Sequence, residues 1–431
     1  MSDQQLKPNE SPPKKDASKV FLEEITRKPS GATSRWRRML GSLLVPLLAI
    51  FTGLVLGGVF IILTTPAFFE AFEESIGEAI KTGWEAVRLA YSALFTGAFG
   101  NPSEIISAIL SGDKAAMTKA FYPFSESLVA TTPYIFGGLS VALGFRIGLF
   151  NIGAEGQIFV GALAATFVGY SLTGLPLFVH MPLAFMAGAV GGALWGFIPG
   201  FLKARTGAHE VINTIMMNYI AFRLSDWLLT GLMKRPDSFN PVSPTIMDTA
   251  KLPRFFDAPI RFHFGFFIAL FMAWLVYWFL WKTKWGFSLR MVGSNPHAAR
   301  YAGVSVTVGI IMGMTLAGGL AGMAGGNEVL GVTHNLAMAF SSGYGFDSIA
   351  IALLGNSHPV GVVLAALLFG ALRNGALNMQ LKAGIPIDII SVVQAMVLVF
   401  IAAPAIIRTI YRLKAPTEGE EGSQLSSWGG N

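Results

Sequence analysis

Long apolar runs alternate with short polar connections along most of the chain. The first run extends from Leu43 to Leu63, and nine more follow at residues 128–147, 157–173, 180–201, 211–231, 264–281, 305–326, 338–356, 359–376 and 388–406. A helix of about 20 apolar residues is long enough to cross the hydrocarbon core of a bilayer. The pattern therefore predicts an all-α, polytopic membrane bundle with about ten transmembrane helices.

Differences in polarity divide the chain into five predicted segments. Residues 1–38 mix charges and prolines without apolar periodicity, which is typical of a disordered cytoplasmic tail. Residues 39–63 form the predicted first transmembrane helix. Residues 64–127 are too polar to span and place acids at helical spacing, which indicates an extracytoplasmic or interfacial segment. Residues 128–407 are the predicted transmembrane core, and residues 408–431 form a second cytoplasmic tail.

Composition supports a membrane protein and excludes several other classes. Of the 431 residues, 53% are hydrophobic and only 13% are charged, far from the balance of a soluble domain. The net charge of +6 comes from basic residues that flank apolar runs, and no basic groove or aromatic stacking platform is legible, so we expect no nucleic-acid partner. The absence of cysteine excludes disulfides and thiolate chemistry.

The distribution of basic residues predicts the orientation in the cell membrane, because cytoplasmic loops carry an excess of Lys and Arg. Ten spans place both termini inside, together with most basic segments: Arg35, Arg37 and Arg38, then Lys203 and Arg205, the run 282–300, and Arg408, Arg412 and Lys414. One loop does not follow this rule. Ten spans place residues 234–261 on the outer side of the membrane, although these residues include five basic and three acidic side chains.

The segment GLFNIGAEGQ, residues 148–157, places Asn151, Glu155 and Gln157 among glycines between two apolar runs. Irregular polar backbone at membrane depth survives only where it is buried in protein or faces water. We therefore predict a broken helix here and name the three polar residues as candidates for the substrate path.

Two further polar groups lie in predicted spans. In GAHEVINTIMMNYIA the spacing of three and four puts Glu210, Asn213, Thr214 and Asn218 on roughly one helical face, which indicates either the path or hydrogen bonding inside the bundle. Asp347 begins an apolar helix, where it either caps the helix and complements its dipole or contacts solute.

A charged loop, GFSLRMVGSNPHAARYAGV at residues 286–304, contains the start of a short helix. Asn295 is suited to cap this helix and Pro296 to its first turn. We expect Ala298, Ala299 and Ala302 to face outward as a docking surface, although short capped helices also occur in simple connectors.

The chain lacks enzyme signatures. It contains no GxSxG elbow, no HExxH motif and no GxxxxGK[ST] phosphate loop, and His358 has no neighbouring metal ligands in the sequence. We expect no catalytic residue, no metal and no cofactor, so any nucleotide that drives transport must bind another chain.

Residues 90–410 resemble a permease subunit of the bacterial ABC importers for nucleosides and simple sugars, within the wider branched-chain amino acid and ribose permease group. The resemblance rests on GLFNIGAEGQ, HEVINTIMMNYIA, LRMVGSNPHAARYAGV and GYGFDSIAIALLGNSHPVG in that order. It implies a type II importer-like bundle in the inner membrane, with a second similar permease, two ATP-binding subunits and an external substrate-binding lipoprotein as partners. The segment 107–125 departs from the usual family pattern.

The same resemblance implies roles for two sets of residues. The loop would dock on the ATPase through a coupling helix, with Arg290, Asn295, Pro296, Ala298, Ala299, Arg300 and Gly303 as the residues concerned. The path would be bordered by Asn151, Glu155, Gln157, Asn213, Asn218 and Asp347. Two alternatives stay open. A branched-chain amino acid permease would need a charged carboxylate clamp, and an ion-coupled secondary carrier would use Glu155 and Asp347 as ion sites.

Overall fold

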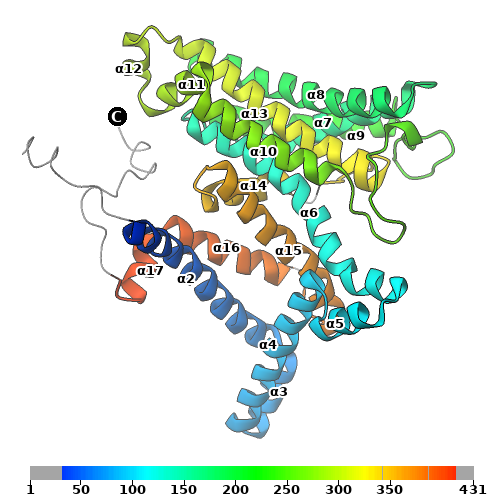
Figure 1. The fold of residues 1–431 in the computed structure, drawn as a ribbon, viewed down its shortest axis with the longest axis vertical. Helices are drawn as coiled ribbons and strands as arrows, with labels where there is room; N and C mark the ends of the chain where they lie inside the picture. Colours follow the sequence, from blue (N-terminus) through cyan, green and yellow to red (C-terminus); the bar gives the residue numbers. More distant parts are fainter. Residues whose placement is uncertain (1–31, 342, 387, 414–431) are drawn as a thin grey trace, which may run out of the picture.

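A computed structural model describes residues 32–341, 343–386 and 388–413, and in these ranges the only regular elements are helices (Figure 1). Their bounds are α2 Ala32–Thr64, α3 Pro66–Glu74, α4 Ile76–Phe99, α5 Pro102–Ser111, α6 Lys114–Arg146, α7 Ala154–Ser171, α8 Leu177–Thr206, α9 Glu210–Thr230, η1 Asp248–Ala250, α10 Gly265–Lys282, α11 Lys284–Ser294, α12 Pro296–Tyr301, α13 Val306–Glu328, η2 Val329–Thr333, α14 Tyr344–Leu354, α15 Pro359–Ala383, α16 Asp388–Ala402 and α17 Pro404–Ile410. The predicted all-α bundle is confirmed.

Six helices among the described residues are long and apolar enough to cross a membrane, namely α2, α6, α8, α10, α13 with the η2 turn, and α15. The other predicted spans correspond to shorter or more polar helices. The run 338–356 differs most from expectation, because Gly343 adopts a left-handed conformation with φ of 89° and α14 begins only after it. With 11 residues, α14 is about 17 Å long, which is too short to cross a bilayer.

The two predicted tails, residues 1–38 and 408–431, have different boundaries from those of the helices in the structure. Residues 1–31 and 414–431 lie outside the described residues, but residues 32–38 form the beginning of α2, because the basic and apolar residues there continue the helical pattern of the first span. At the other end Arg408 belongs to α17, which packs against α2.

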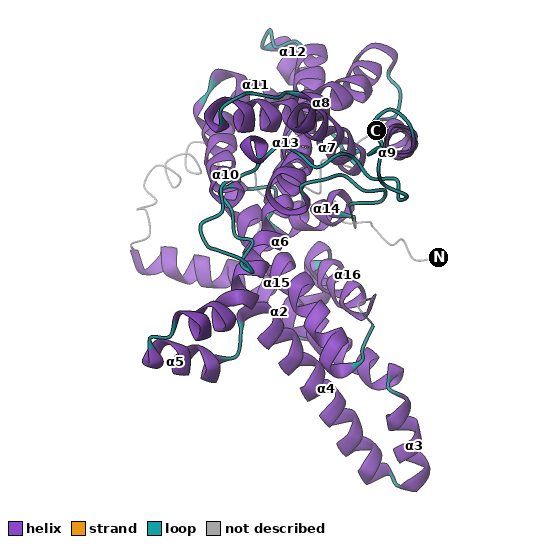
Figure 2. Cartoon of the chain, turned by 90° about the vertical axis from the view of Figure 1, so that its right-hand side faces the viewer, coloured by secondary structure: helices purple, strands orange, loops and turns teal. Residues whose placement is uncertain are grey.

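The segment 64–127 contributes to the helix bundle. α4 packs along α15, where Asn378 Nδ2 donates to Ala93 O at 2.6 Å and Asn374 Nδ2 donates to Gly97 O at 2.9 Å. The buried residues of α4 are mostly Ala and Gly, whereas its exposed side carries charged residues together with large apolar ones such as Trp84 and Phe95, so average polarity conceals the contact. The remainder of α4 extends with α3 away from the bundle (Figure 2).

Small residues allow the helices at the centre of the bundle to pack closely. α13 packs closely against α8 and α7. A Cβ atom built on Gly322 would lie 2.2 Å from Gly188 O and 2.9 Å from Gly192 Cα. Lipid supplies no hydrophobic driving force for helix association, so van der Waals contact between these closely packed backbones stabilises the interface.

The molecule has two opposite ends. α12, the beginning of α2 and α17 lie at the left of Figure 1, whereas the long loop between α9 and α10 lies at the right. We call these the coupling end and the loop end. α7, α8, α9, α10 and α13 form one group of helices, α2, α16 and α17 lie on the other side, and α14 and α15 lie between the two (Figure 1).

Candidate substrate path and coupling surface

The predicted helix break is present between α6 and α7. Gly148 has a φ of 76°, and a Cβ atom there would lie 3.1 Å from Gly293 Cα, so both conformation and space require glycine. Asn151 and Gln157 are 0% and 1% exposed and bond to each other, with Asn151 Nδ2 donating to Gln157 Oε1 at 2.9 Å and Gln157 Nε2 donating to Asn151 Oδ1 at 3.2 Å. This amide pair closes the turn.

α9 is attached to the same break through Asn218. Its Nδ2 donates to Ile152 O at 3.0 Å, and its Oδ1 accepts from Gly156 N at 2.8 Å. The polar face of α9 therefore points into the bundle at this level. Asn213 Nδ2 is also buried but has no hydrogen-bond partner among the described residues.

The beginning of α14 presses against the beginning of α7. Glu155 Oε2 accepts a hydrogen bond from Gly345 N, and a Cβ atom on Gly345 would lie 2.3 Å from Glu155 N. Two motifs that are almost 200 positions apart in the chain, at Glu155 and Asp347, thus meet beside one helix start.

Asp347 lies in the first turn of α14 but does not cap it by a side-chain hydrogen bond. Its Oδ2 accepts from the hydroxyl of Tyr134 at 2.7 Å and lies 3.4 Å from Arg373 Nη1, which also donates to the Tyr134 hydroxyl at 2.7 Å. The Arg373 guanidinium lies 4.9 Å from the ring centroid of Tyr344, whose ring meets that of Tyr134 edge to face at 5.2 Å. α6, α14 and α15 each contribute to this cluster of Tyr134, Tyr344, Asp347 and Arg373.

Sequence reasoning missed three of these four residues. Arg373 gave a usable signal, because an arginine inside the apolar run 359–376 is costly unless it has a partner or a function. Tyr134 and Tyr344 gave none, since an aromatic residue in a span is ordinary.

Charged residues continue from the cluster toward the loop end. Glu328, at the end of α13, has Arg261 and Arg373 as its charged neighbours. Arg261 Nε donates to Glu126 Oε2 at 3.0 Å, and Glu126 lies on α6. Four carboxylates, Glu126, Glu155, Glu328 and Asp347, thus line this row with two guanidinium groups.

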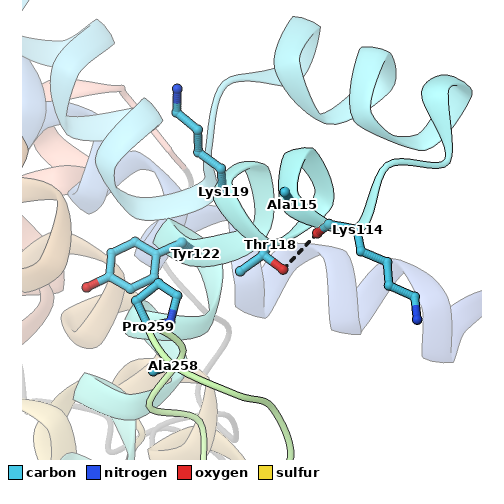
Figure 3. A pocket seen from close by; sticks show the side chains of 7 residues that line it. All are labelled: Lys114, Ala115, Thr118, Lys119, Tyr122, Ala258 and Pro259. Carbon is cyan, nitrogen blue, oxygen red and sulfur yellow. Dashed lines mark hydrogen bonds between the residues drawn. The ribbon is translucent and has the colours of Figure 1, made fainter.

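A wide depression of about 720 Å³ lies at the loop end of this row (Figure 3). It is lined by Lys114, Ala115, Thr118, Lys119, Tyr122, Ala258 and Pro259. Tyr122 lies one helical turn before Glu126 on α6, so the two side chains share a face of the helix. The depression therefore opens next to the Glu126–Arg261 pair.

The coupling loop forms the predicted helix. Asn295 Oδ1 accepts from His297 N and Ala298 N, each at 3.0 Å, and Pro296 occupies the first turn of α12. Among its seven predicted residues, Asn295, Pro296, Ala298, Arg300 and Gly303 are exposed and Arg290 is half-buried. The expectation for Ala299 was wrong, because it is fully buried: a helix of six residues must pack one side against the bundle to stay folded.

No group of three or more His, Asp and Glu residues is arranged to hold a metal ion within the part of the chain that the structure describes. The polar centre offers amide, hydroxyl, carboxylate and guanidinium groups beside aromatic rings. Such a set binds a polar solute by hydrogen bonding and stacking.

Comparison with known proteins identifies relatives along most of the chain. The family model for the permease component of branched-chain amino acid transport systems matches residues 124–402. The chain is 40% identical over 379 residues to a guanosine ABC transporter permease of Bacillus subtilis, covering 86% of this chain and 97% of that protein. It is 36% identical to a glucose ABC transporter permease of Haloferax volcanii, covering 65% and 76% of the two chains. A nucleoside ABC transporter permease of Lactococcus lactis is 35% identical, with coverage of 66% and 80%. No solved structure gives a significant match.

Proposed function

Because the chain belongs to the family of permease components of branched-chain amino acid transport systems, we propose that it is the membrane subunit of an ATP-driven importer for nucleosides. A simple sugar is the second candidate solute, since one relative is a glucose permease. The chain is a multi-pass transport subunit, and separate subunits hydrolyse ATP. An external binding protein delivers the solute.

The observation that carries this proposal is the similarity to the guanosine permease over 97% of that protein's length. It includes both the helix break at residues 148–157 and the coupling loop. A relationship of this extent supports a shared solute class, which a shared fold alone would not do.

The site chemistry supports an uncharged solute. Both guanidinium groups of the row are paired with carboxylates, Arg261 with Glu126 and Arg373 with Asp347, so the row offers no uncompensated cation to a carboxylated solute. Arg373 is already paired with Asp347, which opposes its use as the carboxylate clamp of a branched-chain amino acid permease. Glu155 accepts a backbone hydrogen bond and Asp347 accepts one from Tyr134, so both proposed ion sites of a secondary carrier are engaged.

The mechanism we infer is alternating access. ATP binding closes two nucleotide domains on the coupling end, and α12 moves with them. Gly293, just before α12, lies directly against the backbone of Arg146 and Gly148, so a displacement of the coupling segment shifts the helix break. The Asn218 and Glu155 contacts pass this shift to α9 and α14.

We propose that the coupling end faces the cytoplasm and that a second permease completes the path. The beginning of α2, α12 and α17 lie together at this end, and basic residues are frequent there, in agreement with the positive-inside rule (Figure 1). The loop end then faces outward, toward the external binding protein. The partly exposed cluster residues would face the partner permease across the path.

Uptake measurements test the proposal. Cells with and without this chain, both retaining the ATPase and binding protein, are given labelled guanosine, uridine, glucose or leucine. We expect loss of nucleoside accumulation on removal of the chain, and loss in cells with an inactive ATPase. Accumulation of leucine alone would favour the amino acid permease, and ATPase-independent uptake that collapses with an uncoupler would favour the ion-coupled carrier.

A further inference from the structure

The depression of about 720 Å³ at the loop end combines positive charge with a partly apolar wall. One side is formed by α6 and the other by the loop before α10, with Lys114, Thr118, Lys119 and Tyr122 on α6 and Ala258 and Pro259 in the loop. The lining thus contains two ammonium groups and no carboxylate. A surface of this kind complements a partner that presents negative charge.

The two lysines are available to another molecule. Both are exposed, and neither ammonium group has a hydrogen-bond or ion-pair partner within residues 32–341, 343–386 and 388–413. The acids near them in the chain have other partners. Asp113 is the N-cap of α6, where its oxygens accept from two backbone N–H groups at 3.1 and 3.2 Å, and Glu104 accepts from Asn101 Nδ2 at 3.3 Å.

The side of α6 that lines the depression differs from the side that meets lipid. Met117 and Phe124 are large apolar residues, 38% and 42% exposed, which marks the surface that the bilayer covers. Each lies two positions from a lining residue, Lys119 or Tyr122, and residues two apart on a helix point about 160° away from each other. The loop before α10 closes the other side of the depression. A protein therefore fits this depression better than a lipid does.

The lining side of α6 also leads to the candidate path. Glu126 lies one helical turn after Tyr122, and Arg261 lies two residues after Pro259. Arg261 Nε donates to Glu126 Oε2 at 3.0 Å, which joins α6 to the loop. A molecule seated in the depression thus contacts both elements that hold this ion pair.

We propose that the depression is a docking site for the external binding protein, and that this protein presents at least two carboxylates to Lys114 and Lys119. The lysines extend to different sides of α6, and the Tyr122 ring lies against Pro259 between them (Figure 3). Tyrosine is frequent among the residues that anchor protein interfaces. The inference rests on the proposed function, which requires a binding protein at the loop end. It adds the docking surface and the charge of the partner.

Association rates test the site without measuring transport. The probe is the binding protein that supports nucleoside uptake in the cells described above, loaded with guanosine. It is added to the complete transporter in phosphatidylcholine nanodiscs, with wild-type chain, Lys114→Glu, Lys119→Glu or both substitutions. Lys234→Glu is the matched control, since Lys234 is exposed elsewhere at the loop end. Measurements at about 20 mM and about 500 mM salt separate charge attraction from other contacts, because the higher concentration screens exposed charges.

We expect the double variant to associate roughly 10- to 100-fold more slowly than the wild type at low salt, because attraction between opposite charges accelerates encounter. At high salt the two rates should converge, and Lys234→Glu should stay close to the wild type throughout. A wild-type rate for the double variant at low salt would overturn the inference, and so would an equal loss in Lys234→Glu.

Two other outcomes have separate meanings. If the double variant differs from the wild type only in nanodiscs that contain phosphatidylglycerol, the lysines bind lipid and the inference is overturned. If no external binding protein supports nucleoside uptake with the wild-type chain, the proposed function fails before the docking site is tested.

Tyr122 provides a test that does not depend on charge. Tyr122→Ala removes the aromatic contact and should raise the dissociation rate of the binding protein by roughly 5- to 30-fold at either salt concentration. Tyr122→Phe keeps the ring and should dissociate at a rate closer to that of the wild type. Equal dissociation rates for Tyr122→Ala and the wild type would show that the binding protein does not occupy the depression.

Discussion

The guanidinium carbon of Arg290 lies 5.6 Å from the ring centroid of Trp281, which joins the coupling segment to the end of α10. Arg146, at the end of α6, lies 5.2 Å from the same ring. Arg146 also donates to Ser357 O at 2.9 Å, in the turn between α14 and α15. Trp281 is therefore the shared contact through which the coupling segment reaches both α6 and the helices that hold the Asp347–Arg373 pair.

Replacement of Trp281 by alanine should separate ATP hydrolysis from transport. The variant loses two cation–π contacts, each worth about 0.5–2 kcal/mol, so motion of the coupling segment would reach α6 and α15 only weakly. We expect ATPase activity in the assembled complex to persist while nucleoside uptake falls by roughly tenfold. Trp278→Ala, on the exposed face of the same helix, is the control and should leave both activities intact. A parallel loss of hydrolysis and uptake would contradict a coupling role.

Hydropathy alone located most of the bundle. The predicted runs at residues 211–231, 264–281 and 305–326 differ from α9, α10 and α13 by no more than two residues at either end, because a continuous apolar stretch in a membrane has few alternatives to a helix. α4 was missed for a physical reason. Its buried residues are mostly Ala and Gly, and its four charged residues lower the mean hydropathy, so the contact with α15 leaves no clear hydrophobic signal.

Gly322 offers a direct test of close helix packing. A methyl group there would meet Gly188 O at 2.2 Å and Gly192 Cα at 2.9 Å, and neither backbone atom can move without shifting α8. Gly322→Ala should therefore lower the free energy of unfolding by about 1–3 kcal/mol, as overpacking does. The measurement is the thermal unfolding midpoint of the purified protein in detergent.

Gly319→Ala is the matched control for this substitution. Gly319 lies on the same helix, but a Cβ atom there would have Ala189 O as its nearest neighbour at 3.5 Å, an ordinary contact distance. We expect its midpoint to equal or exceed that of the wild type, because alanine favours helix more than glycine does. Equal losses for both variants would mean that backbone approach does not limit this interface.

The polar centre was only partly predictable. The motifs predicted that residues 148–157 break a helix. The hydrogen bonds between the Asn151 and Gln157 amides could not be predicted, because the sequence offers many other polar groups with which each amide could pair. The same holds for Arg373. Its sequence position signals a costly charge, yet only the packing of α6 against α14 and α15 identifies Tyr134 and Asp347 as its partners.

His263 should make the stability of the protein depend on pH. It lies in the loop before α10, is 1% exposed, and its Nδ1 accepts from Gly265 N. Burial lowers the pKa of His263 from 6.5 to about 4, and Arg254, His334 and Arg261 add to this shift. The unfolded chain thus binds a proton at a higher pH than the folded chain does. The contribution of His263 to the free energy of unfolding is therefore fully present above its unfolded pKa of 6.5 and is lost as the pH falls toward its folded pKa of about 4.

The contribution of His263 at neutral pH is on the order of 3 kcal/mol. We expect the thermal midpoint to fall between pH of about 7.5 and about 5, and His263→Asn to reduce this fall, since its amide oxygen can accept from Gly265 N without gaining a proton. His297→Asn, on the exposed face of α12, should retain the full dependence. An unchanged slope in His263→Asn would assign the acid sensitivity to other groups, such as His334, whose pKa burial also lowers to about 4.

Arg300 provides the test of the coupling surface. It is exposed in the last turn of α12, where a cation also complements the helix dipole, and its neighbours Ala298 and Ala302 are exposed as well. Arg300→Glu places an acid on this surface and should reduce the amount of ATPase that co-purifies with the membrane subunits by roughly tenfold, equivalent to about 1.4 kcal/mol. Arg223→Glu makes the same change of charge on α9, away from the coupling end, and should leave the yield of ATPase unaltered. If both variants retained a full complement of ATPase, α12 would be a connector and the docking surface would have to lie elsewhere on the coupling end.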